Sequence, residues 1–311
     1  MTAGGRGASS FRAGTVLETA GGRYRVQFED GTEGEAVLRG RVRRESRTGD
    51  RVVTGDHVLV SGIMGPETQA IEEVLPRDNE LVRAGPGGRG ARVVASNLDR
   101  CLVVLSGEDP PLEAEVADRF LALAESCGIS PALVLNKVDL PGARERATAL
   151  APLYRAIGYE VILTSASADE GLSALRTLLS SGVSAIIGPS GVGKSSLLNA
   201  LEPGFELRTQ EVGAKGGRGR HTTVSARLLP LASGGWVADT PGFSDVRLWD
   251  VPGESLSAAF PEIAAAAGEC RFRGCSHLHE PGCAVVERVE GGDIAPSRYA
   301  SYRRMAEGRE A

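Results

Sequence analysis

The first part of the chain, up to about residue 75, carries short β-type hydrophobic runs that are separated by glycines. The runs lie at 24–28, 35–38, 57–60 and 71–75. Several short strands at this spacing are typical of a small barrel, and the length suits a five-stranded OB-like fold. We therefore predict an OB-like domain over residues 11–80. The Gly/Ser/Ala-rich stretch before it, residues 1–10, is predicted to be a disordered tail.

From about residue 96 the pattern changes to alternating strands and helices. A continuous apolar run, as expected for a strand that is buried on both faces, lies at 101–105. Further strands are predicted at 131–135, 160–163 and 183–187. Apolar residues recur at helical spacing between these runs. This pattern predicts an α/β doubly wound domain over 96–250, preceded by a glycine-rich linker at 81–95. The remainder, 251–311, is predicted to be a mainly helical module with a final helix near 297–304.

Composition and charge narrow the class of protein. The chain has 311 residues, of which 41% are hydrophobic and 24% are charged, and its formal net charge is −5. It is therefore no polycation, and any contact with nucleic acid has to come from local patches. One such patch is a run of six arginines within 39–58, which can track an RNA backbone or form an ordinary solvated hairpin face. Charge alone does not decide between these two interpretations.

The N-terminal residues lack an apolar signal segment, and no apolar run approaches the length of about 18 residues that spans a bilayer. We therefore expect a cytoplasmic protein without a membrane partner, and a monomer by default. The five cysteines form an odd count, which argues against a disulfide framework.

A phosphate-binding loop follows the strand predicted at 183–187. The sequence Gly-Pro-Ser-Gly-Val-Gly-Lys-Ser fits G-x-x-x-x-G-K-[ST], and a helix is predicted directly after it. Glycines let backbone N–H groups point at phosphate oxygens, the lysine reaches the β- and γ-phosphates, and the serine hydroxyl binds Mg²⁺. The predicted nucleotide contacts here are Gly188, Pro189, Ser190, Gly191, Val192, Gly193, Lys194, Ser195 and Ser196.

Two further segments predict that the nucleotide is GTP or GDP. Asn136-Lys137-Val138-Asp139 follows a strand, where open α/β sheets bind ligands. The Asp139 carboxylate can accept hydrogen bonds from guanine N1–H and the N2 amino group, and adenine lacks both donors. Asn136 is expected to bond the base edge and neighbouring loops, and the Lys137 stem to lie over the ring. Thr164-Ser165-Ala166 resembles the second guanine loop, with Ser165 and the backbone N–H of Ala166 near the base oxygen.

The segments that respond to the γ-phosphate lie between the phosphate-binding loop and residue 250. Asp239-Thr240-Pro241-Gly242 fits D-x-x-G, in which Asp239 supports Mg²⁺ through water and Gly242 senses the γ-phosphate. The basic, glycine-rich stretch 213–223 is interpreted as switch I. One of its threonines, Thr223 or Thr222, is predicted to bind Mg²⁺, and the sequence does not decide between them.

These motifs occur in an unusual order. Ordinary Ras-like GTPases carry the phosphate-binding loop first, whereas here Asn136-Lys137-Val138-Asp139 and Ser165-Ala166 precede it. We predict a circularly permuted GTPase domain, because the same sheet can form when the termini move to another loop.

A cysteine cluster predicts a structural zinc site in the C-terminal module. Cys270, Cys275, His277 and Cys283 have the spacing C-x4-C-x-H-x5-C, and four such soft ligands are typical of structural zinc. His279 is the alternative nitrogen ligand.

Over about residues 12–305, the chain resembles the bacterial ribosome biogenesis GTPases that depend on the small ribosomal subunit. The resemblance rests on the OB-like N-terminus, the permuted motif order and the C-x4-C-x-H-x5-C module. It implies a late assembly factor that binds 16S rRNA and the 30S subunit near the decoding region. It also implies slow hydrolysis of GTP to GDP and phosphate, stimulation by the 30S subunit, and release of the factor on hydrolysis.

The residue that orients the attacking water is a separate question. Phe243 follows the D-x-x-G segment where Ras-like enzymes carry a glutamine, and an apolar side chain cannot orient water. His221, which is similar to a histidine in the family's pattern, is our candidate, and with Lys194 and Thr223 it completes the predicted catalytic set. A loop histidine with an RNA or structural role is the alternative.

Two other functions fit parts of the pattern. The chain can be a nucleotide-regulated rRNA-binding assembly placeholder with incidental turnover. A permuted GTPase acting on the large subunit fits less well, because the OB-like and zinc modules point to the small-subunit family.

Overall fold

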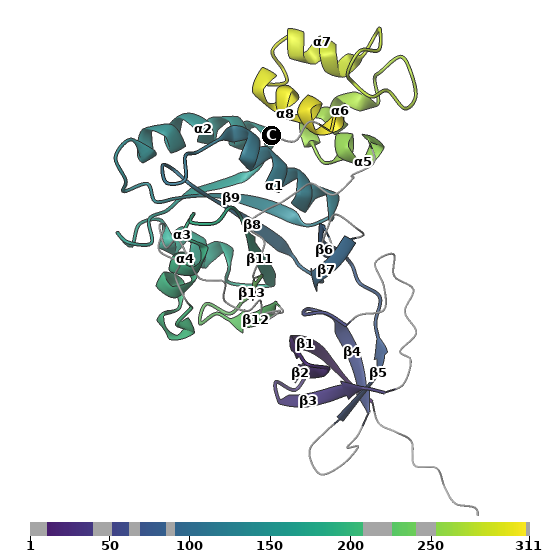
Figure 1. Cartoon of the computed structure of the whole chain (residues 1–311), viewed down its shortest axis with the longest axis vertical. Coiled ribbons are helices and arrows are strands. Elements are labelled where there is room, and N and C mark those ends of the chain that lie inside the picture. Colours follow the sequence, from purple (N-terminus) through teal and green to yellow (C-terminus); the bar gives the residue numbers. More distant parts are fainter. Residues whose placement is uncertain are drawn as a thin grey trace, which may run out of the picture.

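The computed structural model describes residues 11–39, 52–61, 69–84, 91–207, 226–240 and 253–308. Within these ranges the chain forms a small barrel, a central α/β domain and a C-terminal helical module, in that order (Figure 1). Among the helices so described, none combines the length and the apolar character needed to cross a membrane.

The N-terminal barrel has five strands. They are β1 (Arg12–Ala20), β2 (Arg23–Phe28), β3 (Glu33–Leu38), β4 (His57–Ser61) and β5 (Gln69–Val74). The strands follow the order β1-β2-β3-β5-β4, and β1 also pairs with β4, which closes the barrel. Val16, Val26, Phe28 and Ile71 point inward and are buried, as alternating apolar positions require. The prediction of a five-stranded OB-like barrel is confirmed.

The central sheet has the order β10-β9-β8-β11-β13-β12, with only β12 antiparallel to its neighbour. Its strands are β8 (Arg100–Ser106), β9 (Ser130–Asn136), β10 (Glu160–Leu163), β11 (Val183–Ile187), β12 (Arg227–Pro230) and β13 (Trp236–Asp239). The helices are α1 (Ala114–Ser126), α2 (Ala143–Ile157), α3 (Leu172–Leu178) and α4 (Lys194–Leu201), followed by the 3₁₀ turn η2 (Pro203–Phe205). Helices α1 and α2 cover one face of the sheet, and α3 and α4 cover the other (Figure 1).

The barrel and the central sheet are joined strand to strand. β1 pairs with β12 at Glu18 and Arg227, so that eleven strands form one continuous sheet. Leu17 of β1 is buried in the central core beside Leu228. The Thr54 hydroxyl donates a 2.6 Å hydrogen bond to the Ala226 carbonyl. The barrel is therefore packed directly against the strand that precedes β13.

The segment that we predicted as a linker, 81–95, carries regular structure. Strands β6 (Glu80–Ala84) and β7 (Ala91–Ser96) pair antiparallel, and Leu81 is fully buried in the central core. Just before this segment, Arg77 forms a buried ion pair with Asp56 of the barrel, its Nε lying 2.6 Å from Asp56 Oδ1. Burial of Leu81 explains the difference from the prediction, because the glycines that suggested a linker lie at 85–90, outside the described residues.

The C-terminal module contains helices α5 (Gly253–Ala258), α6 (Pro261–Ala267), α7 (Ala284–Glu290) and α8 (Pro296–Ala306). Arg298 of α8 is 1% exposed and lies between two carboxylates. It donates from Nη1 to Asp118 of α1 at 2.7 Å and from Nε to Glu262 of α6 at 2.6 Å. Separating the module from α1 would leave the Asp118 carboxylate buried without its partner, which is energetically costly. This contact therefore fixes the module on α1.

Candidate functional site

The phosphate-binding loop connects β11 to α4 as the sequence predicted. Gly188 has φ 145° and Gly193 has φ 94°, conformations that L side chains rarely adopt. A Cβ atom at Gly188 would overlap the Val104 carbonyl oxygen, and one at Gly193 would overlap the Asn136 side-chain nitrogen. Glycine is therefore required at both ends of this loop by close packing against β8 and β9. The loop presents the N-terminus of α4, where backbone N–H groups and the helix dipole favour an anion.

Lys194, the first residue of α4, is held inside the loop. Its Nζ donates to the carbonyl oxygens of Gly188 at 2.7 Å and Pro189 at 2.8 Å. Burial lowers the pKa of Lys194 to about 8, and nearby Asp239 opposes the shift. A phosphate group entering the loop would offer this ammonium a full anionic partner in place of two neutral carbonyls.

The lowered pKa of Lys194 predicts that nucleotide binding depends on pH. At pH 8 about half of the free protein carries a neutral Lys194, and a bound phosphate favours the charged form, so binding should take up about half a proton. Affinity should fall as the pH rises through 8. Calorimetry of GDP binding in buffers of different ionisation enthalpy measures this uptake. Lys194→Arg is the control, because a guanidinium does not titrate in this range; equal heats in all buffers for the unmodified chain would contradict the prediction.

Asp239 and Ser195 lie on the same side of the loop and line one cavity. This cavity has a volume of about 850 Å³ and extends to Thr54 of the barrel. Asp239 ends β13, and the Thr240 hydroxyl that follows donates to the Ile186 carbonyl at 2.8 Å, which fixes the strand end. Burial raises the pKa of Asp239, while Arg227 and Lys194 oppose the shift.

A hydroxyl and a carboxylate are oxygen ligands of the kind that Mg²⁺ prefers, directly or through water. Ser195 and Asp239 therefore fit the cation that accompanies a nucleoside triphosphate.

Asn136 links residues 136–139, the segment predicted to bind guanine, to the phosphate-binding loop. It ends β9 and is 1% exposed. Its Nδ2 donates to the Val192 carbonyl at 2.9 Å, and its Oδ1 accepts from the Thr164 hydroxyl at 3.1 Å. Asn136 thus makes the contacts to neighbouring loops that the sequence led us to expect. These contacts hold the phosphate-binding loop and the loop at 164–166 at a fixed distance from β9.

Asp139 is exposed and is oriented by two hydroxyls. Ser165 donates to Oδ1 at 2.5 Å, and Ser167 donates to Oδ2 at 2.9 Å. The Ser165 hydrogen bond is the main cause that lowers the pKa of Asp139, and burial opposes it. The carboxylate is therefore an ionised acceptor at neutral pH. Sequence reasoning missed Ser167; the signal was its position two residues after Ser165, where a second side chain can reach the same carboxylate.

The remaining predicted site residues fall into two groups. Lys137 has φ 60°, and its Nζ donates to the Asp109 carbonyl at 2.6 Å, while Ala166 is half-buried between the two serines. The predicted switch residues lie outside the described residues, so the structure gives them no position. They are His221, Thr222, Thr223 and Gly242, and Phe243 lies there as well.

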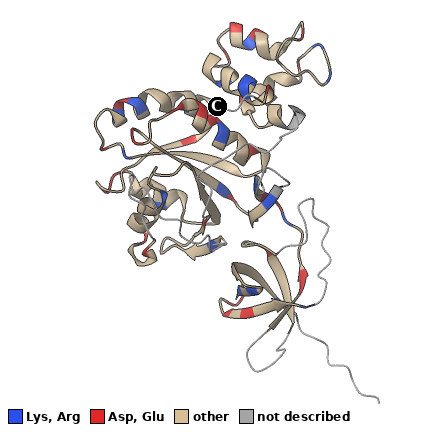
Figure 2. Cartoon of the chain, in the orientation of Figure 1, with Lys and Arg blue, Asp and Glu red and all other residues tan. Residues whose placement is uncertain are grey.

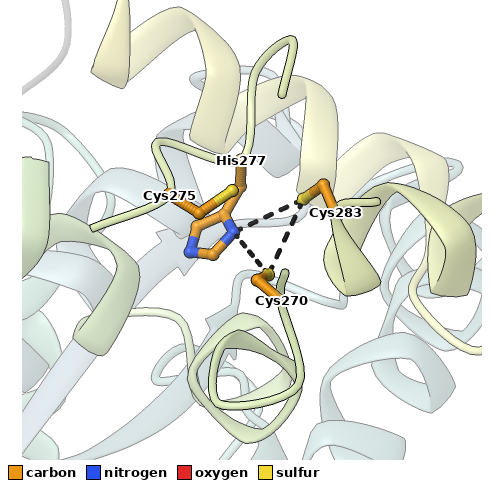
Figure 3. Close-up of side chains that lie close together, drawn as sticks. All are labelled: Cys270, Cys275, His277 and Cys283. Atoms are coloured by element: carbon orange, nitrogen blue, oxygen red, sulfur yellow. Dashed lines mark hydrogen bonds between the residues drawn. The ribbon is translucent and has the colours of Figure 1, made fainter. Parts of the chain in front are cut away.

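The cysteine cluster forms a second candidate site, in the C-terminal module (Figure 3). The ligand atoms of Cys270, Cys275, His277 and Cys283 lie within 4.8 Å of one another. His277 Nδ1 lies 3.5 Å from the sulfurs of Cys270 and Cys283, and these sulfurs lie 3.9 Å apart. A tetrahedral Cys₃His site with Zn–N and Zn–S bonds of about 2.1 and 2.3 Å has N···S and S···S separations of about 3.6 and 3.8 Å. The cluster therefore fits a zinc-sized ion.

The surroundings select His277 and not His279 for this cluster. His277 is 2% exposed, and burial lowers its pKa, so the ring is neutral as a metal ligand must be. His279 is exposed and is absent from the cluster. Tyr299 and Tyr302 of α8 donate to the carbonyls of His277 at 2.7 Å and Ser276 at 2.8 Å, which holds the ligand loop on the helix.

Comparisons with known proteins agree on one family. Residues 74–249 match the family model described as RsgA GTPase. The chain is similar to the small ribosomal subunit biogenesis GTPase RsgA of Gemmatimonas aurantiaca, with 44% identity over 294 residues covering 94% of this chain and 95% of the relative. It is also similar to that of Moorella thermoacetica, with 42% identity covering 93% and 94%.

Solved structures agree over nearly the whole chain. YjeQ from Thermotoga maritima matches with a TM-score of 0.80 and 32% identity, covering 96% of this chain and 99% of that one. YloQ, described as a circularly permuted GTPase, matches with a TM-score of 0.76 and 31% identity, covering 99% and 98%.

Proposed function

Because this chain belongs to the RsgA GTPase family, we propose that it acts in late maturation of the 30S ribosomal subunit. It binds the 30S subunit through 16S rRNA and hydrolyses GTP to GDP and phosphate. The 30S subunit stimulates hydrolysis, and hydrolysis promotes release. The relatives from Gemmatimonas aurantiaca and Moorella thermoacetica are named small ribosomal subunit biogenesis GTPases, and 16S rRNA binding, stimulation and release go beyond that name.

The observation that supports the proposal most directly is a nucleotide site that borders the N-terminal barrel. The phosphate-binding loop, Asp139 and Asp239 follow or end strands β11, β9 and β13 of one sheet, at the edge where open α/β sheets bind ligands. Thr54 of the barrel reaches the cavity that Ser195 and Asp239 line. A partner that binds the barrel therefore contacts the same domain whose Thr54 borders the cavity beside the phosphate-binding loop.

We assign the following roles to the residues of the site. Lys194 and the backbone of residues 188–196 hold the phosphates, and Asp139 with Asn136 selects guanine. Ser195 and Asp239, with Thr223 or Thr222, hold Mg²⁺, which when bound neutralises charge on the phosphate oxygens. Gly242 contacts the γ-phosphate. Phosphoryl transfer depends mainly on such positioning and charge neutralisation.

The test is GTP hydrolysis by the purified chain alone and with 30S, 50S or 70S particles, with ATP as the substrate control. Stimulation by 30S alone is the expected result. Equal, slow turnover in every mixture would favour the alternative, an rRNA-binding placeholder with incidental hydrolysis. Stimulation by 50S instead would point to the large subunit.

His221 is the residue that we propose to orient the attacking water. Replacing it with alanine is expected to lower the 30S-stimulated turnover about a hundredfold, because a positioned water accounts for at least this factor in related chemistry. GTP affinity should stay unchanged, since the imidazole contacts water and not the nucleotide. Single-turnover hydrolysis with saturating 30S subunits measures the effect; a variant with full stimulated turnover removes His221 from the mechanism.

A further inference from the structure

The loop between α6 and α7 carries an exposed aromatic side chain. Phe272 is 46% exposed, and in the described part of the chain only one other large hydrophobic side chain, Phe11, is comparably exposed. The loop projects outward from the C-terminal module, away from the central sheet (Figure 1). Phe272 is therefore available to a partner and contributes little to the core.

The backbone that carries Phe272 is tied to neighbouring parts of the loop. Cys270 and Cys275 flank it and belong to the metal cluster. The Arg271 N–H donates to the Gly282 carbonyl at 3.1 Å, and the Arg271 stem packs on Gly282, where a Cβ atom would approach it to 3.3 Å. A ligand that contacts Phe272 thus meets a preorganised surface, which reduces the entropy lost on binding.

The charge around Phe272 is basic and is not neutralised by nearby acids. Arg271 and Arg273 are both exposed, and the Arg271 guanidinium carbon lies 5.4 Å from the Phe272 ring centroid. Among the described residues, no carboxylate forms an ion pair with either arginine; part of this loop is blue in Figure 2. The exposed arginines of the barrel differ, since carboxylates pair with Arg12, Arg23, Arg25 and Arg39.

An exposed ring whose two chain neighbours are exposed arginines, neither in an ion pair with a described carboxylate, matches the chemistry of a single-stranded nucleotide. Bases stack on aromatic faces, and arginines bind the phosphates on either side. A protein partner would instead favour a larger apolar patch around the ring, and the neighbours here are Arg271, Arg273 and Gly274, all exposed.

We propose that the tip formed by Arg271, Phe272 and Arg273 binds an unpaired nucleotide of RNA, with the base stacked on Phe272. The identity of that RNA, the 16S rRNA of the 30S subunit, rests on the proposed function. The tip is separate from the nucleotide site, so its variants should hydrolyse GTP alone at the unmodified rate.

Binding to 30S subunits tests the proposal with matched variants. Phe272→Ala should weaken 30S binding between about fivefold and a hundredfold, the range measured for loss of one stacked base. Arg273→Ala should weaken binding and reduce the magnitude of the slope of log affinity against log salt concentration by about one. Phe11→Ala is the control, because Arg12 beside it is paired with Asp30. Zinc content confirms that the Phe272 and Arg273 variants keep the C-terminal module folded.

A second measurement separates this proposal from the proposed function. Phe272→Trp places an indole at the tip, and poly(U) should quench its fluorescence on stacking. If the unmodified chain fails to bind 30S subunits, the proposed function is wrong. In that case the quenching by poly(U) still tests whether the tip binds RNA. Unchanged 30S binding by Phe272→Ala, absence of quenching, or a photo-cross-link from position 272 to a ribosomal protein instead of 16S rRNA would each overturn the proposal.

Discussion

An Asp139→Ala variant is expected to lose most of its preference for GTP over ATP, by a factor of about 10⁴. In its proposed role, the unmodified carboxylate would accept two hydrogen bonds from guanine and would be left desolvated and unpaired against adenine, and sites of this kind discriminate by about 10⁴ to 10⁵. Alanine removes both the attraction and the penalty. Competition between labelled GDP and unlabelled ADP or GDP measures the change.

Ser165→Ala is the matched control for this experiment. It removes the 2.5 Å hydrogen bond to Asp139 but leaves the carboxylate in place. Its effect should be about fivefold, as expected from loss of one hydrogen bond worth roughly 1 kcal/mol. If Asp139→Ala changes GDP affinity no more than Ser165→Ala does, Asp139 does not read the base.

The second large effect concerns the metal cluster. Cys283→Ser is expected to abolish metal binding and to unfold the module over 253–308, because structural zinc contributes about 10 kcal/mol or more to folding of such sites. A hydroxyl is a poor substitute for a thiolate ligand. Metal analysis should give one zinc per unmodified chain and none per variant. Limited proteolysis should cut the variant within 253–308 and leave the central domain able to bind GDP.

Cys127→Ser serves as the control for loss of a thiol. Cys127 is a half-buried residue outside the cluster, at the C-terminal end of α1. This variant should keep its zinc and resist the protease. Full metal content in Cys283→Ser would show that the fourth ligand of the ion is some other group.

The parts of the site that sequence predicted well are those determined over short distances along the chain. The phosphate-binding loop is contiguous, and the positive φ angles of Gly188 and Gly193 favour glycine there. A helix follows as predicted, although it begins at Lys194, inside the motif and not directly after it. The Cys and His ligands likewise lie within one loop. The fold class was predicted because strand and helix periodicities alternate clearly, and the permuted GTPase fold is confirmed by the match to YloQ.

The parts that sequence did not predict depend on contacts between distant residues. Asp118 and Arg298 are 180 positions apart, and a buried charged residue leaves no periodic signal that identifies its partner. β12 has only four residues, and its pairing with β1 depends on how the barrel meets the sheet. The arginine-rich run at 39–58 gave an ambiguous charge pattern, and its one arginine within the described residues, Arg39, pairs with Glu72.

The strand pairing between β1 and β12 has a consequence for work with shortened chains. β12 borders the central sheet, and β1 pairs with it at Glu18 and Arg227. A fragment without the barrel would expose the open edge of β12 and leave an empty space where Leu17 packs. Unprotected sheet edges recruit further strands and promote aggregation. The barrel therefore acts as edge protection for the GTPase sheet, and an isolated central domain is expected to associate with itself unless that edge is covered.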